Sequence, residues 1–101
     1  MIAEHGKLDG NLYLDYELAL HGMVTGDVIV DKGGNLYLHG MCCSNLIIKE
    51  GGSVFLHGTV TGDVVNQGGY LEVYGIVGGY LQTQNGETIV DEKAKVMRGG
   101  R

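Results

Sequence analysis

The sequence predicts an all-β, single-domain β-solenoid, that is, a parallel β-helix of about five coils with roughly 18 residues each. His-Gly recurs at residues 5, 21, 39 and 57, and Tyr74-Gly75 continues the series, at spacings of 16, 18, 18 and 17 residues. Apolar residues alternate within each repeat, which is the periodicity of strands. The 101 residues include 19 glycines and no proline, a composition that favours tight turns between short strands.

Aligned on this period, the chain divides into five coils and an unfinished sixth. In chain order the coils are residues 2–17, 18–35, 36–53, 54–70 and 71–88, followed by 89–96. We expect three strand-and-corner units of about six residues in each coil, with successive coils stacked about 4.8 Å apart. The predicted solenoid domain covers residues 1–96, and a flexible tail is expected at 97–101.

The core is predicted from columns of equivalent positions, which keep their apolar character from coil to coil. Each coil can bury its apolar face only against the coils above and below it. The three columns are Leu20, Leu38, Leu56 and Val73; Leu8, Val24, Cys42, Val60 and Val77; and Leu12, Val28, Leu46, Val64 and Leu81.

Glycines are expected to turn the chain at two corners of each coil, with φ angles that other residues resist. At one corner they are Gly10, Gly26, Gly62 and Gly79, and at the other Gly33-Gly34, Gly51-Gly52 and Gly68-Gly69.

Charge and targeting signals restrict the partners and the compartment. The formal net charge is −5, which disfavours nucleic acid and attracts a basic protein. No basic region followed by an apolar run opens the sequence, and no stretch approaches the roughly 20 apolar residues that span a bilayer. Cys42 and Cys43 are adjacent, so on a strand they point to opposite faces and do not form a disulfide. We therefore expect a cytoplasmic protein with no membrane partner.

The histidines of the repeat, His5, His21, His39 and His57, fall in one column that Tyr74 completes. Neutral imidazoles about 4.8 Å apart could share a zinc or copper ion. Ladders of one residue type are also what stacked coils produce, and no Asp or Cys recurs at a position suited to complete a metal site. The stacking interpretation is favoured, and neither a metal nor another cofactor is expected.

A second polar column contains Asn11, Asp27, Asn45 and Asp63. Paired carboxylates can perform acid and base catalysis, but Asx side chains at turns more commonly hydrogen-bond their own backbone. Cys42 occupies a core column, and neither thiol has an aligned histidine to activate it. We predict no catalytic residues and no enzymatic activity.

Apolar residues also recur at alternate positions that should face outward, and a large exposed apolar patch is typical of an interface. The columns are Ile29, Ile47 and Val65; Tyr37 and Phe55; and Met23, Met41 and Ile76. They predict a surface for a partner or for self-association. The open alternative is that β-branched residues simply favour strands, or that one face is phased the other way.

The segments GMVTGDV and GTVTGDV, each followed by an apolar segment and a Gly-Gly turn, resemble the bactofilin family of bacterial polymer-forming cytoskeletal proteins. The resemblance spans most of residues 5 to 96. It implies a right-handed β-helix that self-assembles, and it implies no catalytic residues.

The function favoured by the sequence is that of an acidic binding protein, specifically an immunity protein that occludes a basic bacterial toxin such as a nuclease. The short flanking segments and the charged last segment favour a discrete binder, and compact acidic proteins of this size are typical of that class by analogy. A bactofilin-like structural polymer, formed as a homo-oligomer, is the alternative. The predicted partner-binding residues are Asp27, Asp31, Glu50, Asp63 and Glu72, with Ile29, Ile47, Val65, Tyr37 and Phe55.

Overall fold

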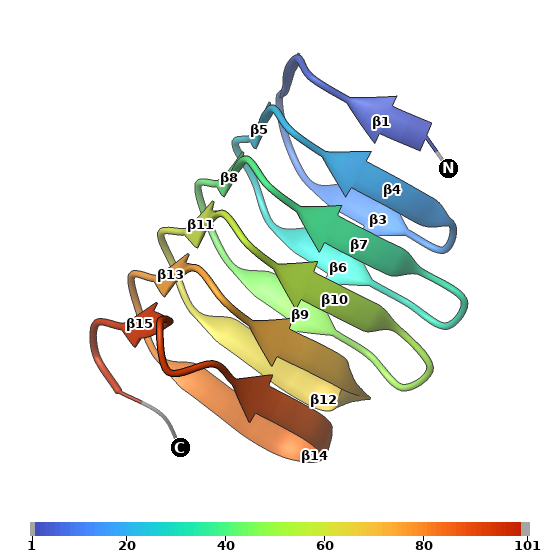
Figure 1. Ribbon diagram of the computed structural model, residues 1–101. Coiled ribbons are helices and arrows are strands. Elements are labelled where there is room, and N and C mark those ends of the chain that lie inside the picture. Colours follow the sequence, from blue (N-terminus) through green and yellow to red (C-terminus); the bar gives the residue numbers. More distant parts are fainter. Residues whose placement is uncertain (1, 100–101) are drawn as a thin grey trace.

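The computed structural model, which describes residues 2–99, is a β-solenoid of parallel stacked coils (Figure 1). The predicted fold class is confirmed, with about five turns of roughly 18 residues. No helix in the described part of the chain is long and apolar enough to cross a membrane.

Each coil contributes strands to three stacks, and all strand pairs are parallel. The first stack contains β1 (Ile2–Glu4), β4 (Glu17–Leu20), β7 (Asn35–Leu38) and β10 (Ser53–Leu56). The second contains β3 (Leu12–Leu14), β6 (Val28–Val30) and β9 (Leu46–Ile48). The longer strands β12 (Val64–Val73) and β14 (Leu81–Val90) bend through the corner and join both stacks. The third contains β2 (Lys7–Leu8), β5 (Met23–Val24), β8 (Met41–Cys42), β11 (Thr59–Val60), β13 (Ile76–Val77) and β15 (Lys95–Val96).

The core runs along the axis of the solenoid, and the three predicted columns line it. Their members are buried, except that Leu8 and Leu12 of the first coil are only partly covered. Leu20, Leu38 and Leu56 pair directly across neighbouring strands, so each side chain packs on its equivalent one coil away. The burial of these columns confirms the predicted assignment of inward-facing and outward-facing positions.

The His-Gly corner repeats because backbone groups of successive coils approach closely there. The N–H groups of His39 and Gly40 both donate to the carbonyl of Leu20, at 2.9 Å each, and Met41 N–H donates to the carbonyl of Gly22 at 2.9 Å. A Cβ on Gly40 would overlap the carbonyl oxygen of Gly22 and lie 2.8 Å from the carbonyl carbon of His21. Only glycine fits this position once a coil precedes it.

At the other corners the predicted role of glycine is only partly correct. Positive φ angles occur at Gly10 (94°), Gly33 (85°) and Gly51 (85°). Seven other glycines expected to have such angles do not have them, and most are needed because a Cβ would contact the preceding coil. These are Gly26, Gly34, Gly52, Gly62, Gly68, Gly69 and Gly79. At Gly26, for example, a Cβ would lie 2.5 Å from the carbonyl oxygen of Gly10.

The turn of the fourth coil is one residue shorter than the turns of the second and third coils. The side chain of the buried Asn66 compensates for the missing residue. In the second and third coils a backbone bond closes the turn, as between Gly52 N–H and the carbonyl of Lys49 at 3.0 Å. In the fourth coil, the Asn66 Oδ1 accepts hydrogen bonds from Gly68 N–H at 3.2 Å and Gly69 N–H at 2.8 Å. The side chain thus takes over the turn hydrogen bond, which explains the spacing of 17 after His57.

The predicted tail, residues 97–101, falls partly outside the described residues, at 100 and 101. Within the described part, Met97 N–H donates to the carbonyl of Val77 at 2.8 Å, and Leu81 N–H donates to the carbonyl of Gly99 at 3.1 Å. Residues 97–99 therefore follow the path of the coil.

Candidate binding surface

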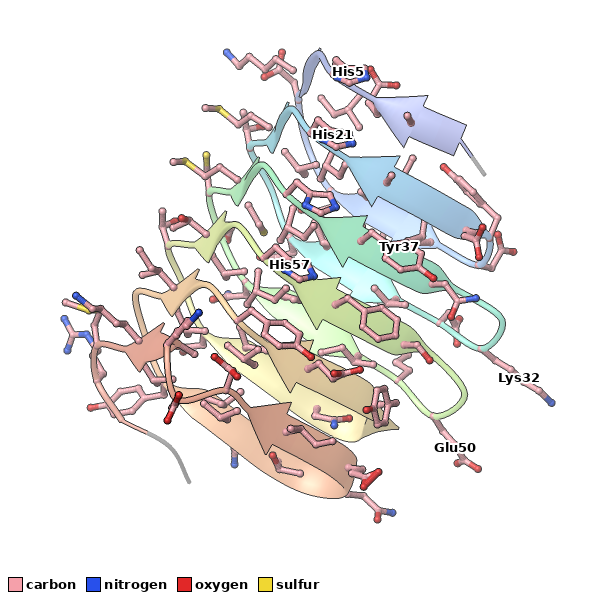
Figure 2. The ribbon with its side chains drawn as sticks, viewed as in Figure 1. His5, His21, Lys32, Tyr37, Glu50 and His57 are labelled. Atoms are coloured by element: carbon pink, nitrogen blue, oxygen red, sulfur yellow. The ribbon has the colours of Figure 1, made fainter. Side chains whose placement is uncertain are left out.

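The ten predicted partner-binding residues lie on two faces and one loop of the solenoid. The outward side of β4, β7, β10 and the second half of β12 is called here the aromatic face, and it carries Tyr37, Phe55 and Glu72. The outward side of β3, β6, β9 and the first half of β12 is called the β6 face, and it carries Asp27, Ile29, Asp31, Ile47, Asp63 and Val65. Glu50 lies in the loop between β9 and β10 (Figure 2). The structure thus groups the predicted residues into separate surfaces.

The aromatic face is built on stacked rings. Tyr37 and Phe55 lie side by side on β7 and β10, with ring centroids 5.0 Å apart and planes inclined by 9°. Tyr70 on β12 continues the cluster, with its ring 6.0 Å from Phe55 and tilted by 56°. All three side chains are partly exposed, so they offer a flat apolar area to a partner.

Glu72 lies at one end of these rings and binds the neighbouring phenols. The Tyr74 hydroxyl donates a short hydrogen bond to the Glu72 carboxylate. The pKa values of Tyr70 and Tyr74 are raised, chiefly by hydrogen bonding of each hydroxyl to the Glu72 carboxylate, with smaller effects of desolvation and negative charge. Both phenols stay neutral donors at neutral pH, and they hold the carboxylate outward on an aromatic surface.

The histidine column has the predicted geometry. Successive rings from His5 to His57 stack with centroids 4.8, 4.8 and 5.1 Å apart, and Tyr74 stacks on His57 at 4.8 Å. Figure 2 shows His5, His21 and His57 in one row along the edge of the first stack.

The stacked rings do not converge on a common point. Neighbouring planes are inclined by only 8–12° along the four histidines. Their nitrogen lone pairs therefore run side by side, whereas a shared zinc needs nitrogens about 2.0–2.1 Å from one ion. Among residues 2–99 no group of three or more His, Cys, Asp or Glu side chains is placed to hold a metal ion.

The Asx column hydrogen-bonds differently from the prediction. Asp27 N–H donates to Asn11 Oδ1 at 2.8 Å, Asn45 N–H to Asp27 Oδ1 at 3.0 Å, and Asp63 N–H to Asn45 Oδ1 at 2.9 Å. Each side chain accepts from the backbone of the next coil and not from its own turn, because the coil spacing places the next N–H within reach. Ser44 Oγ also donates to Asp27 Oδ1 at 2.6 Å. The column ties successive coils together.

Asp27 should make stability depend on pH. Its pKa is lowered, first by the Ser44 hydroxyl and then by the Asn45 N–H. A carboxyl whose pKa is lower in the folded state stabilises the fold above its unfolded pKa of about 3.9, and this contribution is lost as the pH falls below that value. Asp27→Asn should therefore melt below the wild type at pH 7, with a difference that shrinks in acid. Thermal melts across pH measure this; Asp15→Asn, which changes an exposed carboxyl, serves as the control, and a difference independent of pH would refute it.

The two cysteines are both free and face opposite ways, as the sequence predicts. Cys42 is buried, and its Sγ lies 3.5 Å from the carbonyl oxygen of Asn45. Burial raises the pKa of the Cys42 thiol above its ordinary value, which keeps it protonated and unreactive. Cys43 is partly exposed.

A shallow groove of about 530 Å³ runs beside the histidine column. It covers the first three His-Gly corners and the outward residues of β2, β5 and β8 beside them. The lining residues are His5, Gly6, Lys7, His21, Gly22, Met23, Gly40 and Met41. The predicted alignment of Met23, Met41 and Ile76 is confirmed, with Thr59 between the last two.

Sequence reasoning missed Tyr70 and Tyr74 as members of the aromatic face. Tyr70, Glu72 and Tyr74 occupy alternate positions of one segment, so strand periodicity places all three on the same side. That alternation was the available signal, whereas the hydrogen bond between the carboxylate and a phenol required the structure.

Comparisons of the chain with protein-family models, with curated proteins and with solved structures found no match.

Proposed function

We propose that the chain is a non-enzymatic binding protein whose aromatic face binds a basic surface of a partner protein. The observation that carries this proposal is the placement of Glu72, which presents a carboxylate at the end of the Tyr37, Phe55 and Tyr70 rings. An Arg or Lys side chain of a partner could pair with this carboxylate while its stem covers Phe55 or Tyr70.

The charge of the molecule supports a basic partner. The net charge of −5 steers positively charged proteins toward the surface and raises their association rate at low salt. Aromatic residues are enriched at protein interfaces, and tyrosine is enriched at interaction hot spots. The surface is therefore suited to a protein and not to a nucleic-acid backbone.

The finer proposal is a cytoplasmic immunity protein that occludes a basic bacterial toxin, for example a nuclease. A rigid solenoid face needs little ordering on binding, so it can cover an active surface without a large entropic cost. In this proposal Glu72 is the main charged contact, and Glu50 extends the acidic area at the neighbouring loop.

Glu72→Gln is expected to weaken binding of a basic toxin domain at least about tenfold, mainly by loss of a partly desolvated charge pair. The toxin domain encoded nearest the gene is the first probe, titrated by surface plasmon resonance at low and high salt. Glu17→Gln changes the charge equally on the same face but away from Tyr70, so it should bind like the wild type. Identical kinetics for the wild type and Glu72→Gln would refute the assigned contact.

A bactofilin-like structural polymer is the second candidate, and the ends of the solenoid favour it. Within the described residues β1 pairs only with β4, and β14 pairs only with β12. Side chains near the last coil are exposed, including Ile89, Val90 and Met97 at 44%, 48% and 66%. Such strand edges can pair with another rod. Light scattering that finds long assemblies growing with concentration would favour this candidate.

A further inference from the structure

We propose that two copies of this chain pair through the β6 face about a two-fold axis that passes between β6 and β9. This inference is independent of the proposed function, because the aromatic face stays uncovered in such a dimer.

The β6 face carries an uncovered apolar column. Tyr13, Ile29, Ile47 and Val65 are directly paired neighbours on adjacent strands. Tyr13 is 69% exposed, and the other three are partly exposed between buried residues. No described segment of the chain packs over this column. A flat sheet face of this kind packs well on a second sheet at about 10 Å.

The position that follows each of these strands carries Asp15, Asp31, Lys49 and Gln67 in successive coils, so the charge changes sign between the second and third coils. Asp31 and Lys49 follow the paired residues Val30 and Ile48, so they occupy equivalent positions on adjacent coils. Both are exposed. Within residues 2–99 the one ion pair is Lys7 with Asp9, so neither Asp31 nor Lys49 has a salt-bridge partner there. The loops beyond them carry a second pair of opposite charges, Lys32 and Glu50, which Figure 2 shows extending away from the solenoid.

A two-fold axis along the strands, between β6 and β9, makes these charges complementary. This rotation sets each column of one copy opposite the same column of the other copy, with the coils in reverse order. Asp31 of one copy then faces Lys49 of the other. The further pairs across the axis are Ile29 with Ile47, Asp27 with Asn45, Tyr13 with Val65, Asp15 with Gln67, and Asn11 with Asp63.

Three other axes would place like charges opposite each other. An axis on β6 would face Asp31 with Asp31, and an axis on β9 would face Lys49 with Lys49. An axis parallel to the solenoid would exchange the outer columns and set Asp31 against Asp27. Because like charges that face each other at an interface are unfavourable, the charge pattern favours the axis between β6 and β9 over these three. The interface is isologous, as in most symmetric dimers.

A charge-swap series tests the axis directly. The wild type should sediment as a dimer that dissociates on dilution. Asp31→Lys and Lys49→Asp should each weaken the dimer at least about tenfold, because each places like charges opposite. The double variant Asp31→Lys with Lys49→Asp restores opposite signs and should return to within about threefold of the wild type. Glu17→Lys, the same charge change on the aromatic face, should leave the dimer unchanged.

Sedimentation equilibrium gives the dissociation constants, and thermal melts verify that each variant is folded. Ile47→Lys should abolish the dimer while leaving a folded monomer, because Ile47 is already partly exposed. A monomeric wild type, a double variant as weak as either single variant, or assemblies that grow beyond a dimer would each overturn the proposal. A monomeric wild type would leave the proposed function intact, since that function depends on Glu72 and the aromatic face.

Discussion

Gly40→Ala should destabilise the protein by about 4 kcal/mol or more, a large fraction of the stability of a domain of this size. The added methyl group would overlap the carbonyl oxygen of Gly22, which is fixed by its hydrogen bond from Met41 N–H. Neither group can move without breaking the hydrogen bonds between the second and third coils. Urea denaturation followed by circular dichroism measures the loss.

Gly6→Ala is the matched control for this substitution. Gly6 occupies the same His-Gly position in the first coil, but the nearest atom to an added Cβ is the Glu4 Oε1, at 3.4 Å. The side chain of Glu4 can move, so the stability should change by less than about 1 kcal/mol. Equal losses in Gly6→Ala and Gly40→Ala would show that the approach of the coil backbones is not the reason for the repeated glycine.

Asn66→Val is expected to cost about 3 kcal/mol or more, although valine suits a strand better than asparagine does. Asn66 is fully buried, and its Nδ2 donates to the carbonyls of Gly69 at 3.2 Å and Glu87 at 2.9 Å. Its Oδ1 accepts the two N–H groups that close the short turn. Valine would leave these backbone groups buried without partners, and each such group costs about 1–3 kcal/mol.

The control for Asn66 is the equivalent inward position of the preceding coil, Ile48, which pairs with Asn66. Ile48→Val removes one methylene from the core and should cost only about 0.5–1.5 kcal/mol. The two variants should therefore differ clearly in urea midpoint. An Asn66→Val variant as stable as Ile48→Val would show that water or a rearranged turn satisfies the freed groups.

The sequence predicted the solenoid correctly because its repeat is a local property. Leu20, Leu38 and Leu56 each directly precede a His-Gly pair, and parallel coils in register place such residues in one column. The strand period then separates inward from outward positions, which identified the core and the outward apolar residues. No long-range information was needed for either step.

Other features depended on how neighbouring coils meet. Asp27 was expected to hydrogen-bond its own turn, but the next coil supplies an N–H at 3.0 Å. Gly26 was expected to adopt a positive φ, but it is glycine because the backbone of the preceding coil approaches it. Both interactions cross between coils. The spacing along the chain therefore predicted where Asp27 and Gly26 lie in the coil, but not which contact requires each residue type.

The candidate surfaces also combine features that the sequence predicts with features that only the tertiary structure shows. The sequence by itself determined that Ile29, Ile47, Tyr37 and Phe55 face outward, because alternation along a strand fixes the side of each residue. Only the tertiary structure decided that the isoleucines and the aromatic residues lie on different faces, because the angle at each corner sets which strands share a surface. It also brought Glu72 into contact with the Tyr74 hydroxyl, since the contact depends on side-chain rotamers that the repeat does not encode.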